Sequence, residues 1–483
     1  MSLSSAISNA VSGLTAVSRG TEIVASNLAN ASTPGYGARE VSLSARTFGG
    51  GVHVDGVIRR VPVAILADSR LAQADLGKAL LTHDFHSRIE QAVGSANQPD
   101  SLLGMFNDFE NALTIAAATP ESGPRLQGVL DGAQALTQKI RAIADTIQAS
   151  RSEADQRIAK DIDRLNTSLS EIARLNRMIT VARSKGQDSA GLEDARQNMI
   201  AGISDIVAIQ EVPRANGQIA LFTKGGATLL DGTTPAKIEF SATPVITPQM
   251  SFQHGQLGGI TFDGMALSGN QMSLFRGGSL EAAFDIRDNL APGYQSTIDT
   301  YAADLYRRVA TDTVDPTIGT GMPGLFTDRQ STLSNVDLTG FANRIEVNAA
   351  LDPENGGILS RIRDGLYGLS SQNVADGTIL NNIRDALARR DSAMIPRTGV
   401  TNHSATTFAS EILTFAANDR LKSEAGAQKS KSYSEGIEMM LAAHGVDSDQ
   451  EIEQLIQLEK AYAANAKVIQ AANDMLDQLL RLS

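Results

Sequence analysis

The chain has 483 residues, of which 42% are hydrophobic and 20% are charged, and it contains no cysteine and no tryptophan. This length and composition predict a globular protein of about two to four domains rather than a disordered chain. The formal net charge of −12 argues against a nucleic-acid binder, and the lack of cysteine excludes disulfide bonds and thiol chemistry.

The first thirty residues carry an apolar stripe with heptad spacing. Its positions follow one another by steps of four and three, with one polar member: Leu3, Ile7, Ala10, Leu14, Val17, Thr21, Val24 and Leu28. This pattern predicts an amphipathic helix that buries its stripe against another helix. Pro34 and Gly35 should end that helix, because proline cannot continue it and glycine permits a turn.

The N-terminus does not have the form of a secretory signal, since residues 1–5 lack a cationic region and the apolar residues that follow are spaced. No run of about 18 apolar residues occurs, so we expect no membrane span. A helix lying on a membrane surface would need several Lys and Arg residues, and the first thirty residues contain only Arg19.

The next part of the chain is predicted to be mainly helical. Residues 32–51 are polar and glycine-bearing, and residues 52–61 suggest short extended segments around a turn at Asp55–Gly56. Long helices are then predicted over residues 63–93, from Ser101 to about 118, and from about 125 to 184.

A β-rich insertion interrupts the helices at residues 204–276, where prolines, glycine pairs and β-branched residues become frequent. Asn216–Gly217 predicts a tight hairpin. Helices resume at 278–311, occur in pieces over 355–390 and return at 405–443, so the insertion is an excursion from a helical body.

Residues 448–482 are predicted to form a second amphipathic helix. Its apolar positions again fall three or four residues apart: Leu455, Leu458, Tyr462, Ala466, Ile469, Ala472, Leu476 and Leu479. Because one such stripe lies at each end of the chain, we expect the two terminal helices to pair as a coiled coil and to present further apolar surface to neighbouring copies.

The predicted fold is therefore mainly α with a β insertion, an α+β multidomain architecture. Residues 1–45 and 445–483 form a terminal coiled-coil assembly domain. Residues 46–203 and 277–444 form a long helical-bundle body, and residues 204–276 form a small all-β outer domain.

Catalytic and cofactor-binding constellations are poor. His83 and His86 lie three residues apart on a predicted helix, but no third metal ligand follows at a recognisable spacing, so solvated histidines are the favoured interpretation. Gly49–Gly51 precedes a strand rather than a helix, which disfavours a phosphate-binding loop. We expect no catalytic residues, no metal and no cofactor.

Several segments resemble bacterial flagellar rod, hook and hook-associated proteins. The terminal segments are 25–36, 51–60 and 444–470, and two interior segments, 172–179 and 191–197, resemble the hook-associated FlgK family within this superfamily. The chain departs from the family pattern at Gly37–Glu40, where a polar residue followed by Arg and Gln is usual, and near Asp194.

The resemblance implies a structural role, with no enzymatic activity, at the junction between hook and filament. It implies a ring of copies of this chain, contacts with hook protein and with the second junction protein (hook-associated protein 3), a cytosolic export chaperone, and type III export to the extracellular flagellum without a cleaved signal peptide. The implied assembly residues are Leu3, Ile7, Ala10, Leu14, Val17, Val24, Asn27, Leu28, Asn30, Pro34, Gly35 and Tyr36 near the N-terminus. Those implied for assembly and chaperone binding near the C-terminus are Leu455, Leu458, Tyr462, Ala466, Ile469, Leu476 and Leu479.

Two alternatives stay open. The nearer one is another axial protein, either a hook protein or a distal rod protein. The more distant one is a helical enzyme or a membrane-surface protein, for which the sequence lacks convergent titratable groups and a basic helix face.

Overall fold

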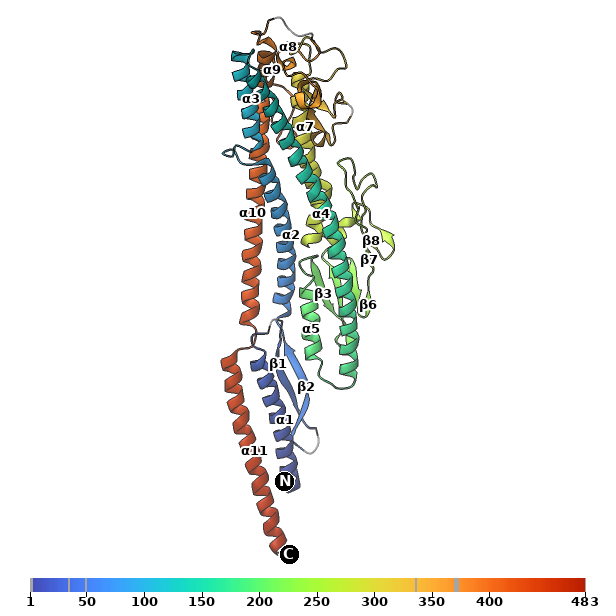
Figure 1. The fold of residues 1–483 in the computed structure, drawn as a ribbon. Coiled ribbons are helices and arrows are strands. Elements are labelled where there is room, and N and C mark those ends of the chain that lie inside the picture. The colour runs from blue at the N-terminus through green and yellow to red at the C-terminus, as the bar shows by residue number, and fades with distance from the viewer. Residues whose placement is uncertain (1–2, 34, 48–49, 335–336, 369–372, 483) are drawn as a thin grey trace.

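A computed structural model describes residues 3–33, 35–47, 50–334, 337–368 and 373–482. Its spine is α4 (Gly123–Ser184), a helix of 62 residues. The apolar side chains that recur every three or four residues along α4 are buried, among them Leu136, Ile147, Leu165 and Ile179. At 1.5 Å per residue α4 is about 90 Å long, and this length gives the protein its rod-like form (Figure 1).

Three further helices run along the rod beside α4. Helices α2 (Val63–Val93) and α10 (Ala405–Ala443) lie side by side over much of their length (Figure 1). Helix α3 (Leu102–Ala118) starts at Ser101, whose Oγ accepts a hydrogen bond from the Gly104 amide at 3.0 Å, as the sequence predicted. The helical segments expected at 63–93, 102–118 and 405–443 are confirmed.

The end of the rod far from the two chain termini consists of short helices and loops (Figure 1). Helix α6 (Gly278–Asp285) continues through a π-helical turn, Ile286–Leu290, into α7 (Ala291–Val309). Helix α7 leads to a head that contains α8 (Arg361–Asp364), α9 (Thr378–Ala388) and an antiparallel pair of short strands, β10 (Phe326–Asp328) and β11 (Ile345–Val347).

The β insertion lies against α4. One antiparallel sheet has the order β3 (Ile209–Pro213), β4 (Ile219–Thr223), β5 (Thr228–Asp231), β6 (Thr234–Pro235), and a second has β7 (Ile238–Glu239), β8 (Thr261–Phe262), β9 (Met265–Ala266). Strands β3 and β4 are joined at Asn216 and Gly217, both with positive φ, which confirms the predicted hairpin. Helix α5 (Ala190–Ala201) packs against the end of α4, next to β3 (Figure 1).

Buried arginines attach the insertion to the helices. The guanidinium of Arg151, on α4, donates to the carbonyl oxygens of Thr247 at 3.2 Å and Met250 at 2.7 Å. Arg287, in the π-helical turn, donates to Asp155 Oδ1 at 2.6 Å, and the Thr243 amide donates to Asp155 Oδ2 at 2.6 Å. Both side chains of the Arg287–Asp155 pair are fully buried.

The two chain ends meet at the other end of the rod (Figure 1). Helix α1 (Leu3–Ala29) packs against α11 (Ser448–Leu482) and against an antiparallel hairpin of β1 (Ala38–Ala45) and β2 (Val52–Arg60). These four elements are called the terminal unit below, and the remainder is called the body. The structure thus confirms a mainly α fold with a β insertion and paired terminal helices.

Two details of the hairpin differ from the sequence prediction. Residues 38–45, expected to be part of an irregular stretch, form β1. The turn expected at Asp55–Gly56 is wrong, because β2 continues through it: Ser42 pairs with Gly56 and Leu43 with Val54, so Asp55 is the extra residue of a bulge. A glycine within a strand commonly marks such a bulge rather than a turn.

Within the described ranges, no helix combines the length and apolar character required to cross a membrane.

Replacing Asp155 with Ala should destabilise the insertion, because the fully buried Arg287 would lose its partner on α4 and keep only the neighbouring Asp288, and the Thr243 amide would lose its acceptor. We expect a loss of about 3–5 kcal/mol, seen in calorimetry as a lower melting temperature. The matched control is Glu153→Ala two residues away, which removes an exposed pair with Arg88 and should change stability by less than about 0.5 kcal/mol. Equal effects of the two substitutions would contradict this account of the buried pair.

Candidate self-association interface

The two terminal helices run antiparallel in a heptad register. Small or polar residues seven apart on α1 face residues seven apart on α11: Gly13 faces Asn465, Gly20 faces Leu458, and Asn27 faces Glu451. A Cβ added at Gly20 would lie 3.0 Å from a methyl carbon of Leu458. The two glycines therefore permit the close approach of α11.

The predicted stripe on α1 is only partly buried in the single chain. Ala10, Val17 and Val24 are buried, whereas Leu3, Ile7, Leu14 and Leu28 are half-buried. The stripe thus packs within the terminal unit and retains accessible apolar surface.

The predicted residues of α11 divide into two groups. Leu455, Leu458 and Ile469 are half-buried and lie on the same side of α11 as Asn465, which faces α1. Tyr462 and Ala466 are exposed, as are Leu476 and Leu479 farther along. The side of α11 that faces α1 contains Asn465. Because a helix turns about 100° per residue, Tyr462 and Ala466 lie away from that side.

Asn27 is the centre of the terminal unit and is fully buried. Its Nδ2 donates to Glu451 Oε1 at 2.8 Å and to the Arg39 carbonyl at 2.9 Å, and its Oδ1 accepts from the Tyr36 hydroxyl at 2.9 Å and from the Arg39 amide at 3.1 Å. One amide group therefore connects α1, the loop, β1 and α11, with all four of its hydrogen-bonding positions used.

Burial raises the pKa of the Glu451 carboxyl above its ordinary value, although the hydrogen bond from Asn27 partly opposes this effect. The second carboxyl oxygen, Oε2, is buried and has no hydrogen-bond partner within the described residues. The Asn27–Glu451 contact is therefore specific in geometry but bears an electrostatic cost.

The residues after Asn27 shape the turn out of α1. Asn30 Nδ2 donates to the Ser26 carbonyl at 2.8 Å at the end of the helix. Gly35 has a φ of +75°, which favours glycine, and a Cβ there would lie 1.8 Å from Asn198 Oδ1 on α5, so any other residue would also displace that side chain. Pro34, the remaining predicted assembly residue, lies outside the described residues.

Asp194 on α5 joins the hairpin to the body. Its carboxylate accepts from the Gly37 amide at 3.1 Å, from Arg39 Nη2 at 2.9 Å and from Arg59 Nε. Asp194 is 8% exposed. Gly37 belongs to this arrangement, because a Cβ at that position would lie 2.6 Å from Arg59 Nε. The departure from the family pattern at residue 37 therefore has a local physical reason.

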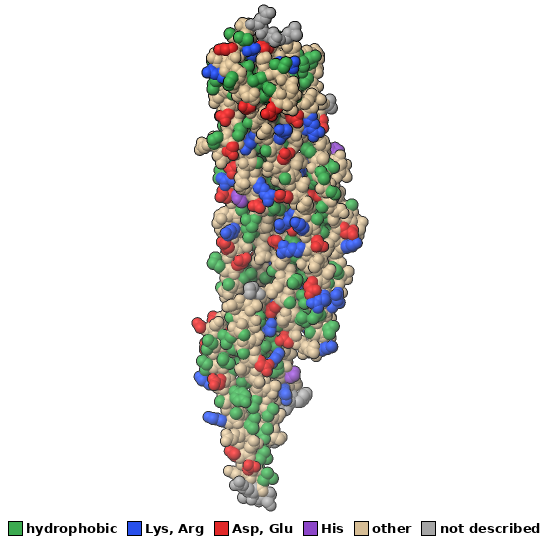
Figure 2. All heavy atoms as spheres, in the orientation of Figure 1, with side chains coloured by type: hydrophobic (Ala, Val, Ile, Leu, Met, Phe, Trp, Pro, Cys, Tyr) green, Lys and Arg blue, Asp and Glu red, His purple; other side chains and the backbone are tan. Residues whose placement is uncertain are grey.

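Apolar side chains are exposed along α11. Figure 2 shows hydrophobic side chains gathered over the terminal unit in the lower part of the view, whereas the body above it shows mixed charges. Tyr462 is 54% exposed and Leu479 is 60% exposed, and other large apolar residues on α11 share this exposure: Ile452, Ile456, Val468, Met475, Leu476 and Leu480. Such a surface is typical of a helix that awaits a further partner.

The histidines of the sequence analysis serve as packing residues. His86 is buried, with Nδ1 3.3 Å from the Tyr294 hydroxyl, so the expectation of a solvated side chain is wrong for this residue. His83 Nδ1 lies 3.3 Å from Ser423 Oγ. No group of three potential metal-ligating side chains occurs among the residues that the structure describes.

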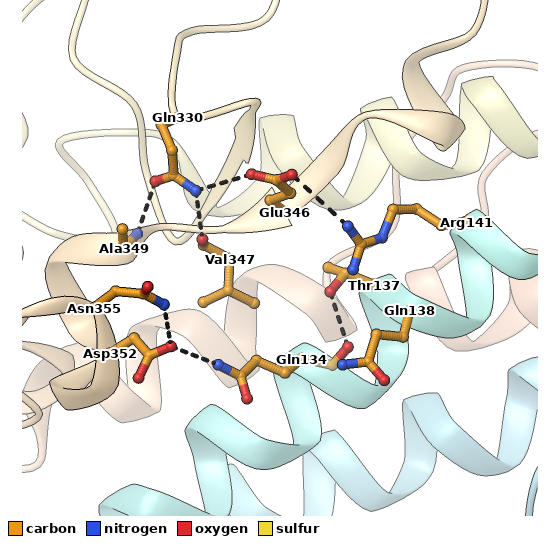
Figure 3. Close-up of a pocket in the computed structure, with 10 residues that line it drawn as sticks. All are labelled: Gln134, Thr137, Gln138, Arg141, Gln330, Glu346, Val347, Ala349, Asp352 and Asn355. Atoms are coloured by element: carbon orange, nitrogen blue, oxygen red, sulfur yellow. Dashed lines mark hydrogen bonds and ion pairs between the residues drawn. The ribbon is translucent and has the colours of Figure 1, made fainter.

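A polar hollow lies between α4 and the β10–β11 region (Figure 3). Its volume is about 240 Å³. Gln330 spans it, donating to Glu346 at 3.1 Å and accepting from the Ala349 amide at 2.8 Å, while Gln134 and Asn355 both donate to Asp352. Most of the polar side chains that line it are therefore hydrogen-bonded to protein groups within the hollow.

Three family models match the chain. Residues 86–312 match the flagellar hook-associated protein FlgK helical domain, residues 439–482 the flagellar basal body rod FlgEFG protein C-terminal model, and residues 7–36 the flagella basal body rod protein model. The chain is thus similar to the FlgK family of flagellar hook-associated proteins over this interior segment. The two rod-type models coincide with the helices of the terminal unit, and the FlgK model with much of the body.

Relatives of the FlgK family were found in several bacteria. Flagellar hook-associated protein 1 of Escherichia coli strain K12 is 23% identical over 311 residues, which cover 58% of this chain and 56% of the relative. The protein of the same name from Salmonella typhimurium is 24% identical, covering 58% and 55%. The matched region thus spans about half the length of these relatives.

A solved structure of the flagellar hook junction protein FlgK from Burkholderia pseudomallei is 19% identical, with a TM-score of 0.44 over 54% of this chain and 46% of that chain.

The sequence analysis missed three residues that organise the interface: Gly13, Gly20 and Asp194. A signal for the glycines was present, because Gly13, Gly20 and Asn27 repeat every seven residues beside the predicted stripe. Asp194 had no such signal, since its arginine partners, Arg39 and Arg59, are more than a hundred residues away in the sequence.

Replacing Asn27 with Ala should release α11 and the hairpin from α1, because four hydrogen bonds are lost and buried partners are left unsatisfied. We expect a local cost of about 2–4 kcal/mol. Hydrogen exchange should become faster in residues 36–60 and 448–482 but not in α4. The control is Asn30→Ala, just after the end of α1, which removes only local contacts. Protection of α11 unaltered by Asn27→Ala would contradict the central role of Asn27.

Proposed function

We propose that this protein is a structural component of the bacterial flagellum that connects hook to filament by polymerising through its terminal unit. The observation that carries the proposal is the antiparallel α1–α11 pair with exposed apolar side chains at one end of the rod, in a chain similar to FlgK. This similarity supports a flagellar component that self-assembles within the axial structure.

The partners proposed are other copies of the chain in a ring, hook protein, the second junction protein and a cytosolic export chaperone. The half-buried residues Leu3, Ile7, Leu14 and Leu28 offer surface for neighbouring α1 helices. The exposed residues Tyr462, Leu476 and Leu479 offer surface for neighbouring α11 helices or, before export, for the chaperone. Extracellular localisation through type III export belongs to the same proposal.

The domain limits are also proposed. The expected boundary at residue 45 would divide the β1–β2 hairpin, whose two strands pair throughout and pack on α1. We therefore place the end of the N-terminal part of the assembly domain near residue 62 and keep its C-terminal part at 445–483. The β insertion is kept at 204–276, which contains β3 to β9.

The alternatives are less well supported. A hook or distal rod protein would share the terminal segments, but the FlgK helical-domain match at 86–312 lies in the interior of the chain. An enzyme would need a cleft with converging reactive groups. The hollow of Figure 3 is lined by polar side chains that hydrogen-bond to one another, among them Gln330, Glu346 and Asp352.

The assembly function is tested by Leu14→Asp, which places a charge in the half-buried stripe of α1. If neighbouring helices cover Leu14, the unpaired charge should cost several kcal/mol per subunit, roughly 3–5. We expect a strain with this substitution to make intact hooks, lack filaments and release filament protein into the medium.

The matched control is Thr15→Asp, on the exposed side of the same helix, which should support filaments. Leu230→Asp, in the buried core of the β insertion, should unfold that insertion locally and impair the junction less. Normal filaments and motility with Leu14→Asp would refute assembly through the α1 stripe.

Chaperone binding is tested by removing residues 445–483. Because α11 carries much of the exposed apolar surface of the terminal unit, co-purification of the chaperone should be lost while the body stays folded. A full-length chain with Tyr462→Ser and Leu479→Ser should show weakened binding with an unchanged fold. Undiminished binding by the truncated chain would place the chaperone site elsewhere.

A further inference from the structure

The terminal unit has few attachments to the body. The chain passes between them at Val61–Pro62 and at residues 444–447, and the main packing contact between them is that of β2 on α5. A cleft of about 580 Å³ opens beside this contact, bordered by β2, Arg19 and the turn between α4 and α5. The orientation of the terminal unit therefore depends on a small number of side chains.

We propose that Asp194 is the positioning residue that fixes the terminal unit in line with the body. Its single carboxylate accepts from β1 through Arg39, from β2 through Arg59 and from the loop through the Gly37 amide. The three ionised side chains are 11–16% exposed, so water and salt screen their attraction less than that of a surface pair. The inference rests on the proposed function only for its consequence in assembly.

The other ion pair across the joint is weaker. Arg19 Nη2 lies 3.7 Å from Asp188 Oδ2, the Arg19 side chain is 38% exposed, and Arg19 also pairs with Glu22 on its own helix at 2.8 Å. A long, exposed and shared pair contributes little to a fixed geometry. Arg19 is therefore a matched control for Asp194.

Helix α5 is itself held from the opposite direction. Three residues after Asp194, Gln197 accepts from Arg70 on α2 and donates to Glu211 on β3, while Arg70 pairs with Glu211 at 2.8 Å. Arg196 donates to Asn176 on α4 at 2.8 Å and to the Gly217 carbonyl at 2.7 Å. Asp194 thus projects from a helix anchored to α2, α4 and the β insertion, which makes it a firm point of attachment.

The test measures a distance across the joint in the full-length monomer. The sequence contains no cysteine, so Ser18→Cys on α1 and Thr167→Cys on α4, both exposed positions, give a unique pair of spin labels. We expect one narrow distance distribution in the parent protein and its loss, as a broad distribution, with Asp194→Ala. Arg19→Ala should retain the narrow distribution.

A second variant separates positioning from folding. Arg59→Ala removes the same contact from the terminal unit, and because both substitutions act on one interaction, the double variant should broaden the distribution no more than Asp194→Ala alone. Circular dichroism should show unchanged helix content in each variant. A narrow parent-like distribution with Asp194→Ala, or equal broadening with Arg19→Ala, would overturn the proposal.

The distance measured in the monomer tests the role of Asp194 whether or not the proposed assembly function is correct. If Asp194→Ala broadens the monomer distribution and filaments still form, Asp194 positions the terminal unit but that position is not needed at the junction. If Leu14→Asp supports normal filaments, the proposed function fails while the distance measurement still decides the role of Asp194.

Discussion

The structure depends on the contact between two segments that are more than 400 residues apart in the chain. Asn27 and Glu451 meet in a hydrogen bond with a sequence separation of 424, and the glycines at 13 and 20 continue that register along the pair. Everything between the two ends leaves α1 and returns to α11. The chain of the body therefore begins and ends at the α1–α11 pair.

The α1–α11 pair depends more on specific contacts than on the burial of apolar side chains. Gly13 and Gly20 bring the two backbones close, and the polar centre at Asn27 fixes the register, as single buried asparagines do in coiled coils. The raised pKa of Glu451 means that its protonated carboxyl is favoured when α11 is packed on α1. Packing of α11 on α1 is therefore stabilised at low pH. That contribution is lost as the pH rises through the pKa that Glu451 has in the packed state. Much of α11 is exposed, and neighbouring copies would supply burial that the single chain lacks.

Periodicity was sufficient to predict most of the fold. The bounds of α2, α3 and α10, the hairpin at Asn216–Gly217 and the pairing of the terminal helices all follow from apolar spacing, capping residues and turn residues, which are local properties. The features that were missed depend on partners far away in the sequence. Residues 38–45 form a strand because β2 and α1 cover them, and Tyr462 faces outward because the row on α11 is set by the glycines of α1. His86 is buried because α7 packs over it. No local pattern contains this information.

The two parts of the molecule are stabilised by different kinds of interaction. The body has a continuous apolar core along α4, reinforced by fully buried ion pairs such as Arg287–Asp155, which are costly to break because either charge alone would remain desolvated. The terminal unit relies on one amide, two glycines and one carboxylate at the joint. In the proposed function, the terminal unit would complete its packing among other copies while the body is already folded, and this separation fits that requirement. If the terminal unit buried its apolar residues as fully as the body does, little surface would be left for a neighbour to cover. The apolar side chains of α4 are thus buried within the chain, whereas those of α11 stay available for contact with a neighbour.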